Sequence, residues 1–80
     1  MQIKNGKHPN LIKLGKQIRE LRAAKDYSQE DFAAEVDIDR SYMGGIERGE
    51  RNVATLNLIR IAKALGVEVG KLFPPINRLS

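Results

Sequence analysis

The segment from Ser28 to Gly49 constrains the fold more than any other part of the sequence, because it encodes two short helices joined by a tight turn. Ser28 is expected to begin the first helix as an N-cap, and Asp31, three residues later, completes a variant of the capping box. Asp39 is the N-cap expected for the second helix, which runs from Arg40 and stops at Gly49. The pattern therefore predicts two helices that meet at a corner.

Apolar residues recur at helical spacing on both of these helices and give each of them one buried face. The expected buried positions are Phe32, Ala33, Val36, Met43 and Ile46. A helix, a short turn, a second helix and a stop form the helix-turn-helix unit, predicted here over residues 28–48. This arrangement lays the second helix along a groove of DNA.

The same periodicity predicts three further helices and an all-α domain, since no strand-like alternation is long enough to compete. The first helix opens at Pro9-Asn10, the fourth is capped by Thr55, and a short fifth helix spans residues 68–73. The expected buried stripes are Leu11, Leu14, Ile18 and Leu21 in the first helix, and Leu56, Ile59, Ala62 and Leu65 in the fourth. The expected organisation is a basic tail over residues 1–9, a domain over residues 10–75, and a tail over residues 76–80 that is a candidate dimer contact.

Several short motifs are spaced in a specific order along residues 11–73. They are Ile18-Arg19, Leu21-Arg22, Ser28-Gln29-Glu30, Ile46-Glu47-Arg48-Gly49 and Ala62-Lys63-Ala64-Leu65-Gly66-Val67. The chain therefore resembles the lambda-repressor-like (xenobiotic-response-element) family of bacterial and phage regulators, which is a compact five-helix DNA-binding domain. Within that family, the segments Asp39-Arg40-Ser41-Tyr42, Gly45-Ile46-Glu47-Arg48 and Arg51-Asn52 are similar to the controller proteins of restriction–modification systems.

Direct reading of base edges requires side chains on the exposed N-terminal part of the second motif helix. The first candidate is Arg40, because a guanidinium can donate two parallel hydrogen bonds to guanine, a contact worth about 1–3 kcal/mol of discrimination. The alternative for Arg40 is a surface ion pair with Asp37 or Asp39. Ser41 and Tyr42 are further candidates, with a role at the helix N-terminus and a partly buried position as their respective alternatives.

The adjacent glycines Gly44 and Gly45 are an unusual choice inside a helix, where each costs roughly 0.5–1 kcal/mol relative to alanine. Their missing side chains allow either close approach to DNA or close packing against a neighbouring helix. The hypothesis is that one of the two glycines allows the approach to DNA and the other allows the helix packing. The family resemblance implies that Gly45 faces DNA. It also implies that Arg51 is a second base reader, with a phosphate contact as the alternative.

Candidate phosphate contacts lie at helix N-termini and in the loop beside the groove. They are Gln29, which matches a family glutamine that touches the DNA backbone, and Arg48, Asn52 and Thr55. The resemblance further implies a structural ion pair between Arg22 and Glu47 inside the fold. Asp37 stands where the family usually has glycine, so its backbone is expected in the left-handed conformation.

The net charge of +4 and the pI near 9.7 favour a polyanionic partner, although residues 28–52 carry seven acids and only three arginines. Binding is therefore expected to depend on geometry and dimerisation more than on total charge.

The chain has no cysteine, no apolar run of the ~20 residues that span a bilayer, and no signal-peptide pattern, so a cytoplasmic protein is expected. His8 is the single histidine, and no nucleophile, carboxylate pair or metal-ligand set accompanies it, so neither an enzyme nor a metal or other cofactor is expected.

These features predict a sequence-specific, homodimeric and autoregulatory transcription regulator. Its two recognition helices would lie about 34 Å apart over a palindrome. The candidate dimer residues are Leu58, Ile61, Val69, Leu72, Phe73 and Ile76, with completion of the small core as the alternative for some of them. An antitoxin that binds a toxin protein and its own promoter, and a protein-interaction module without DNA binding, are the other interpretations. Besides double-stranded DNA and a second copy, RNA polymerase and a toxin are the candidate partners.

Overall fold

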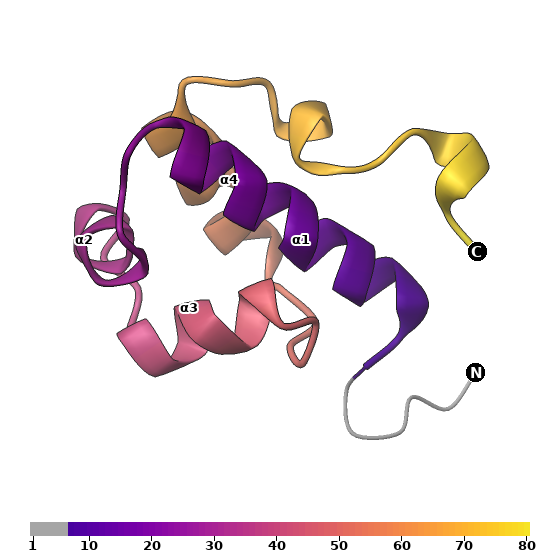
Figure 1. Cartoon of the computed structure of the whole chain (residues 1–80), viewed down its shortest axis with the longest axis horizontal. Helices are drawn as coiled ribbons and strands as arrows, with labels where there is room; N and C mark the ends of the chain where they lie inside the picture. The colour runs from indigo at the N-terminus through magenta and orange to yellow at the C-terminus, as the bar shows by residue number, and fades with distance from the viewer. Residues whose placement is uncertain (1–6) are drawn as a thin grey trace.

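The structure is a computed structural model that describes residues 7–80, and it is an all-helical domain (Figure 1). Its elements in chain order are α1 (Pro9–Ala24), α2 (Gln29–Glu35), α3 (Arg40–Glu47), α4 (Thr55–Leu65), and the 3-10 helices η2 (Val69–Leu72) and η3 (Ile76–Arg78). Over the described residues there is no strand, and no helix is long and apolar enough to cross a membrane. The predicted all-α class is confirmed, and the expected fifth helix is present as the short η2 turn.

Three helices begin with a side chain that accepts hydrogen bonds from the first backbone amides. Ser28 Oγ accepts from the Asp31 amide at 3.0 Å, and Asp39 Oδ2 accepts from the amides of Ser41 and Tyr42 at 3.0 and 3.3 Å. These caps define the two motif helices where the sequence predicted them. His8 caps α1 in the same way, because its Nδ1 accepts a hydrogen bond from the Asn10 amide at 3.0 Å. His8 therefore belongs to the domain and not to the expected tail.

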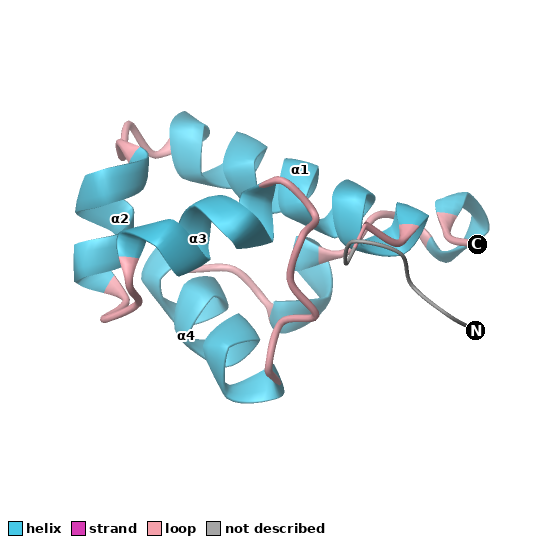
Figure 2. Ribbon diagram, turned by 90° about the horizontal axis from the view of Figure 1, so that it is seen from below, coloured by secondary structure: helices cyan, strands magenta, loops and turns pink. Residues whose placement is uncertain are grey.

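Two residues other than glycine, Asp26 and Asp37, have left-handed backbones in the turns before and after α2. Asp37 has φ +56°, which confirms that the turn between α2 and α3 survives without glycine. Figure 2 shows this short loop between α2 and α3. Thr55, by contrast, is the first residue inside α4, and the N-cap is Ala54, which makes no side-chain capping bond. The predicted cap at Thr55 is therefore wrong.

The core is built from aliphatic side chains and one phenylalanine. Its buried members are Leu14, Ile18, Phe32, Ala33, Val36, Ile38, Met43, Ile46, Ile61, Ala62, Leu65 and Leu72. Helix α3 packs against both α1 and α2, and α4 packs against η2. The predicted faces of α2 and α3 are thus buried as expected, and α3 is held on two sides with its first turn at the surface.

The buried face of α4 differs from the predicted stripe. Leu56 and Ile59 are 71% and 38% exposed, whereas Ile61 is fully buried and Leu58 packs partly against the core. Four of the six residues from Leu56 to Ile61 are large and aliphatic, so two adjacent helical stripes are equally apolar in the sequence. Packing against η2 decides which positions are buried. Ala62 and Leu65 are buried as predicted, whereas Leu56 and Ile59 are not, so the prediction is wrong for these two residues.

The backbone of α1 lies close to the end of α3 at Gly15. A Cβ atom on Gly15 would lie 2.3 Å from the carbonyl oxygen of Ile46 and 2.7 Å from that of Glu47. Gly49, with φ +78°, ends α3 in the same region, and a Cβ there would lie 2.6 Å from the Ile12 Cα. The glycine that permits close helix packing is therefore Gly15, which the sequence analysis did not identify.

We expect Gly15→Ala to destabilise the domain by about 1–3 kcal/mol through overpacking, even though alanine favours an isolated helix. The added methyl group meets backbone atoms of α3, which cannot move aside as a flexible side chain could. Urea denaturation followed by circular dichroism measures the change. Gly70→Ala is the matched control, because no atom lies within 4 Å of the Cβ position there. Equal stabilities of the two variants would contradict the proposed contact.

Candidate nucleic-acid interface

The first turn of α3 presents polar side chains to solvent. Arg40 and Ser41 are exposed, and the Asp39 cap holds the backbone beneath them. The nearest acid to Arg40 is Glu30, with Nη1 and Oε1 3.9 Å apart and both side chains more than half exposed. An exposed pair at this distance contributes little, so the Arg40 guanidinium can exchange this partner for a base or a phosphate. The ion pair is made to Glu30 and to neither aspartate considered from the sequence.

Tyr42 of α3 and Arg51 of the loop that follows it form a second polar feature. Tyr42 is half-buried against the core, and the Arg51 guanidinium carbon lies 5.6 Å from the centre of its ring, a cation–π contact. The Arg51 side chain also lies over Gly45, where a Cβ would be 3.0 Å from Arg51 Cγ. Gly45 therefore makes room for Arg51, which brings a cation from the following loop to the surface of α3.

Gly44 makes room in the same way for the side chains of Arg48 and Gln29. A Cβ on Gly44 would lie 2.9 Å from Arg48 Nη1 and 3.3 Å from Gln29 Oε1. Gly44 faces Gln29 of the neighbouring helix α2, whereas Gly45 faces Arg51 of the loop after α3, so one of the two glycines lies at a helix–helix contact, in line with the hypothesis. Together Gln29, Arg40, Ser41, Gly44 and Arg48 line a polar hollow of about 270 Å³.

A buried ionic network lies beneath this surface. Arg22 donates from Nε to Glu47 Oε2 at 2.7 Å and from Nη2 to Glu47 Oε1 at 3.0 Å, so the pair is bidentate. The Arg22 and Glu47 side chains are only 11% and 3% exposed. Arg22 Nη1 also donates to the carbonyl of Tyr27, and Gln29 Nε2 donates to Glu47 Oε1 at 3.0 Å. The Arg22–Glu47 pair implied by the resemblance is present, and Gln29 connects it to the polar hollow.

Arg48 is paired on the surface with Glu50, just after α3. Its Nε donates to Glu50 Oε2 at 3.0 Å and its Nη2 to Glu50 Oε1 at 3.1 Å. These hydrogen bonds raise the pKa of Arg48 and lower the pKa of Glu50, with the opposite charge acting in the same direction. The other two candidate phosphate contacts, Asn52 and Thr55, are exposed in the loop and in the first turn of α4.

The candidate dimer residues separate into three groups, of which the first is Leu58, partly buried against the core. Ile61 and Leu72 are fully buried inside the single chain, so they cannot contact a partner, and that part of the prediction is wrong. They complete the small core, as the alternative interpretation held. Val69, Phe73 and Ile76 are exposed, at 37%, 38% and 83%.

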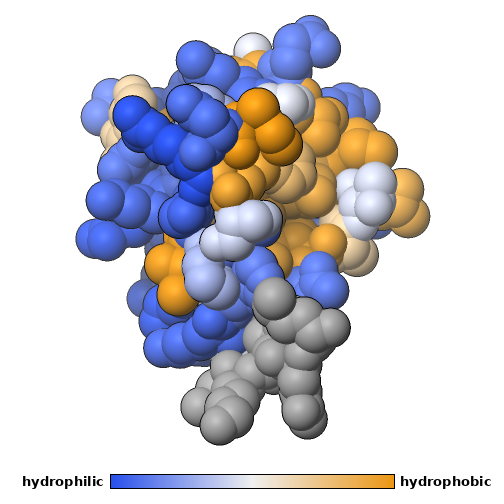
Figure 3. Space-filling view, turned by 90° about the vertical axis from the view of Figure 1, so that its right-hand side faces the viewer, coloured by the Kyte–Doolittle hydropathy of each residue, from blue (hydrophilic) through white to orange (hydrophobic). Residues whose placement is uncertain are grey.

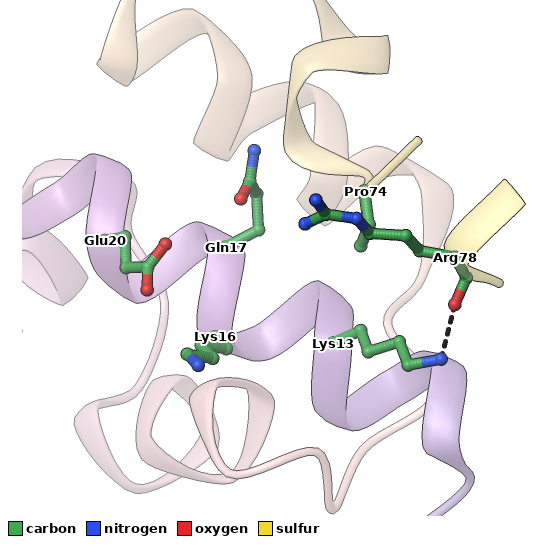
Figure 4. Close-up of a pocket in the computed structure, with 6 residues that line it drawn as sticks. All are labelled: Lys13, Lys16, Gln17, Glu20, Pro74 and Arg78. Atoms are coloured by element: carbon green, nitrogen blue, oxygen red, sulfur yellow. Dashed lines mark hydrogen bonds between the residues drawn. The ribbon is translucent and has the colours of Figure 1, made fainter. Parts of the chain in front are cut away.

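A larger hollow of about 520 Å³ lies between α1 and the C-terminal segment (Figure 4). Its lining is Lys13, Lys16, Gln17, Glu20, Pro74 and Arg78. The Lys13 amine donates to the Arg78 carbonyl, and Asn10 Oδ1 accepts from the Ser80 amide at 2.8 Å. Residues 76–80 therefore fold back on α1 and are no loose tail. Within residues 7–80, no cluster of histidine and acidic side chains could hold a metal ion.

An exposed and capped first turn, held at a corner by two other helices and flanked by three arginines, defines a DNA-binding helix-turn-helix domain. A family model for the helix-turn-helix matches residues 18–72, and the chain belongs to this family. The match covers the motif and the helices that pack on it.

Known relatives place the chain more narrowly. It is 44% identical over 68 residues to the control protein C.MunI of a Mycoplasma species, a match that covers 84% of this chain and 92% of the relative. The crystal structure of the restriction–modification controller protein C.AhdI from Aeromonas hydrophila superposes with a TM-score of 0.80 at 48% identity, covering 82% of this chain and all of that one. SinR, a master regulator for biofilm formation solved in complex with DNA, superposes with a TM-score of 0.71 at 30% identity, covering 74% and 95%. The chain is therefore a DNA-binding transcription regulator similar to restriction–modification controller proteins, and not an enzyme.

We expect Glu47→Ala to destabilise the domain by about 3–5 kcal/mol, because it leaves the buried Arg22 guanidinium without its bidentate partner. Urea denaturation measures the loss. Glu20→Ala, which removes an exposed carboxylate of α1, is the control and should change stability by about 0.5 kcal/mol or less. A Glu47 variant as stable as this control would show that the network does not hold the fold together.

Proposed function

We propose that this protein binds a palindromic operator as a homodimer and thereby controls a restriction–modification operon that includes its own gene. The observation that carries the proposal is the exposed first turn of α3, with Arg40 and Ser41 above a polar hollow and Arg51 beside them. The similarity to C.MunI and C.AhdI supports the choice of operon. Because the target is genomic DNA, the proposed activity lies in the cytoplasm.

In this proposal the side chains divide into those that read bases and those that hold phosphates. Arg40, Ser41, Tyr42 and Arg51 are the proposed base readers, and Gly45 contributes by making room for Arg51. Gln29, Arg48, Asn52 and Thr55 are the proposed phosphate contacts. Phosphate contacts on both sides of α3 would fix its orientation in the major groove. The proposed contacts from α2 and from the residues after α3 therefore act together.

The proposed dimer surface follows from which apolar side chains the fold leaves exposed. These are Ile12, Leu56, Ile59, Val69, Phe73 and Ile76. Figure 3 shows a broad apolar area on the side of the molecule where α1 begins and the chain ends. An exposed area of this kind is a common mark of an association surface. A second copy is the occupant that a palindromic operator requires, because its two-fold symmetry must be matched by the protein.

Arg40→Ala is expected to weaken operator binding by about 1–3 kcal/mol while leaving binding to scrambled DNA nearly unchanged. Fluorescence anisotropy with the DNA upstream of its own gene, over a series of salt concentrations, measures both affinities. Arg60→Ala removes an exposed arginine of α4 and serves as the charge-matched control. Equal loss on operator and scrambled DNA would assign Arg40 to the phosphates and remove it from base reading.

Leu56→Lys is expected to raise the dimer dissociation constant at least about tenfold, because each copy loses a large apolar side chain from the interface. Leu56 is 71% exposed in the single chain, so its own fold should remain intact. Sedimentation velocity over a range of concentrations measures the change, with Ala34→Lys on exposed α2 as the control. A wild-type protein that stays monomeric at micromolar concentration would contradict the homodimer.

A further inference from the structure

Glu50 occupies the two N–H groups of Arg48 that a DNA phosphate would use. The carboxylate accepts from Nε at 3.0 Å and from Nη2 at 3.1 Å, and a phosphate binds a guanidinium through the same planar, bidentate arrangement. The Lys7 amine lies 3.8 Å from Glu50 Oε2 and adds a second cation to this carboxylate. Glu50 therefore stands in the position of an anion at the edge of the proposed DNA-binding surface.

The turn that carries Glu50 is held rigidly in the fold. The Glu50 amide donates to the carbonyl of Gly45 at 2.8 Å, and the Gly49 amide donates to that of Ile46 at 3.1 Å, which is the Schellman pattern at the end of a helix. Gly49 is packed against the backbone of Ile12. The backbone that carries the carboxylate is thus fixed near Arg48, so only the two side chains lose conformational freedom when the pair forms.

The pair can nevertheless be exchanged. The side chains of Arg48 and Glu50 are 59% and 33% exposed, and an ion pair in contact with water contributes little net free energy. Arg48 also lines the polar hollow with Gln29 and Arg40, so its guanidinium needs to turn only a short way to face a groove of DNA. This movement of the Arg48 side chain breaks its two hydrogen bonds with Glu50.

We propose that Glu50 is a built-in competitor of the DNA backbone, which holds Arg48 in the unbound protein and is displaced by a phosphate when the operator binds. This inference rests on the proposed phosphate contact of Arg48. Its consequence is a lower affinity for all DNA, because every complex that uses Arg48 must first displace the carboxylate. The sequence agrees with this role, since the motif carries more acids than arginines.

The test is a double-mutant cycle on the full chain, with operator DNA and anisotropy detection over a salt series. Glu50→Gln keeps the shape of the side chain and removes its charge, and Arg48→Gln removes the guanidinium. Glu50→Gln should tighten operator binding about threefold to fivefold in the wild-type background and by less than about twofold in the Arg48→Gln background. Arg48→Gln alone should weaken binding and reduce the salt slope by about one unit.

A matched control separates competition from a general effect of charge. Glu20→Gln removes an exposed carboxylate that lines the larger hollow between α1 and the C-terminal segment. It should change the affinity for operator DNA by less than about twofold. Equal tightening by Glu50→Gln in both backgrounds would overturn the proposal and assign its effect to net charge. Unchanged or weaker binding by Glu50→Gln would overturn it as well.

The Glu50 carboxyl offers a direct readout that mutation does not disturb. In the unbound protein the hydrogen bonds from Arg48 lower its pKa, so displacement by a phosphate should raise that pKa in the complex. A carboxyl-detected NMR titration with and without operator measures the change, and an unaltered pKa would overturn the proposal. If the wild-type protein does not prefer operator over scrambled DNA, the proposed function fails instead, and this outcome is distinct from a failed cycle.

Discussion

The bidentate ion pair between Arg22 and Glu47 is the interaction on which the arrangement of the motif depends. Both side chains are almost fully buried, and Arg22 also donates to the Tyr27 carbonyl while Glu47 also accepts from Gln29. Because the pair joins α1 to α3 and Gln29 adds α2, one carboxylate orients three helices. Gly15 allows the backbones to approach closely enough for this contact, so the pair and the glycine depend on each other.

Four of the seven acids in residues 28–52 have partners that the fold provides. Asp39 caps α3, Glu47 is paired with Arg22, Glu50 with Arg48, and Glu30 lies near Arg40. These acids are used for capping and pairing inside the protein, and their negative charge is largely balanced there. The two glycines of α3 have the complementary effect, because they allow the long side chains of Arg48 and Arg51 to lie close against the helix.

Local sequence signals predicted the motif well and the outer helices less well. Side-chain caps, the left-handed Asp37 and the apolar face of α3 are decided within a few residues, so the sequence shows them directly. The face of α4 depends on what packs against it, because Leu56, Leu58, Ile59 and Ile61 are chemically alike. The same ambiguity placed Ile61 and Leu72 on the candidate dimer surface, although both lie in the core.

The sequence by itself determined the helical class, the boundaries of the motif and the set of side chains proposed to contact DNA, since these depend on caps, periodicity and residue chemistry. The resemblance to a family added the Arg22–Glu47 pair, which no local pattern contains because the partners are 25 residues apart. Only the tertiary structure decided that Gly15 is the close-packing glycine, that Gly44 and Gly45 accommodate arginines, and that Glu50 reaches Arg48. Each of these depends on the distance between side chains on different elements or across a turn, which packing sets and the order of residues does not state.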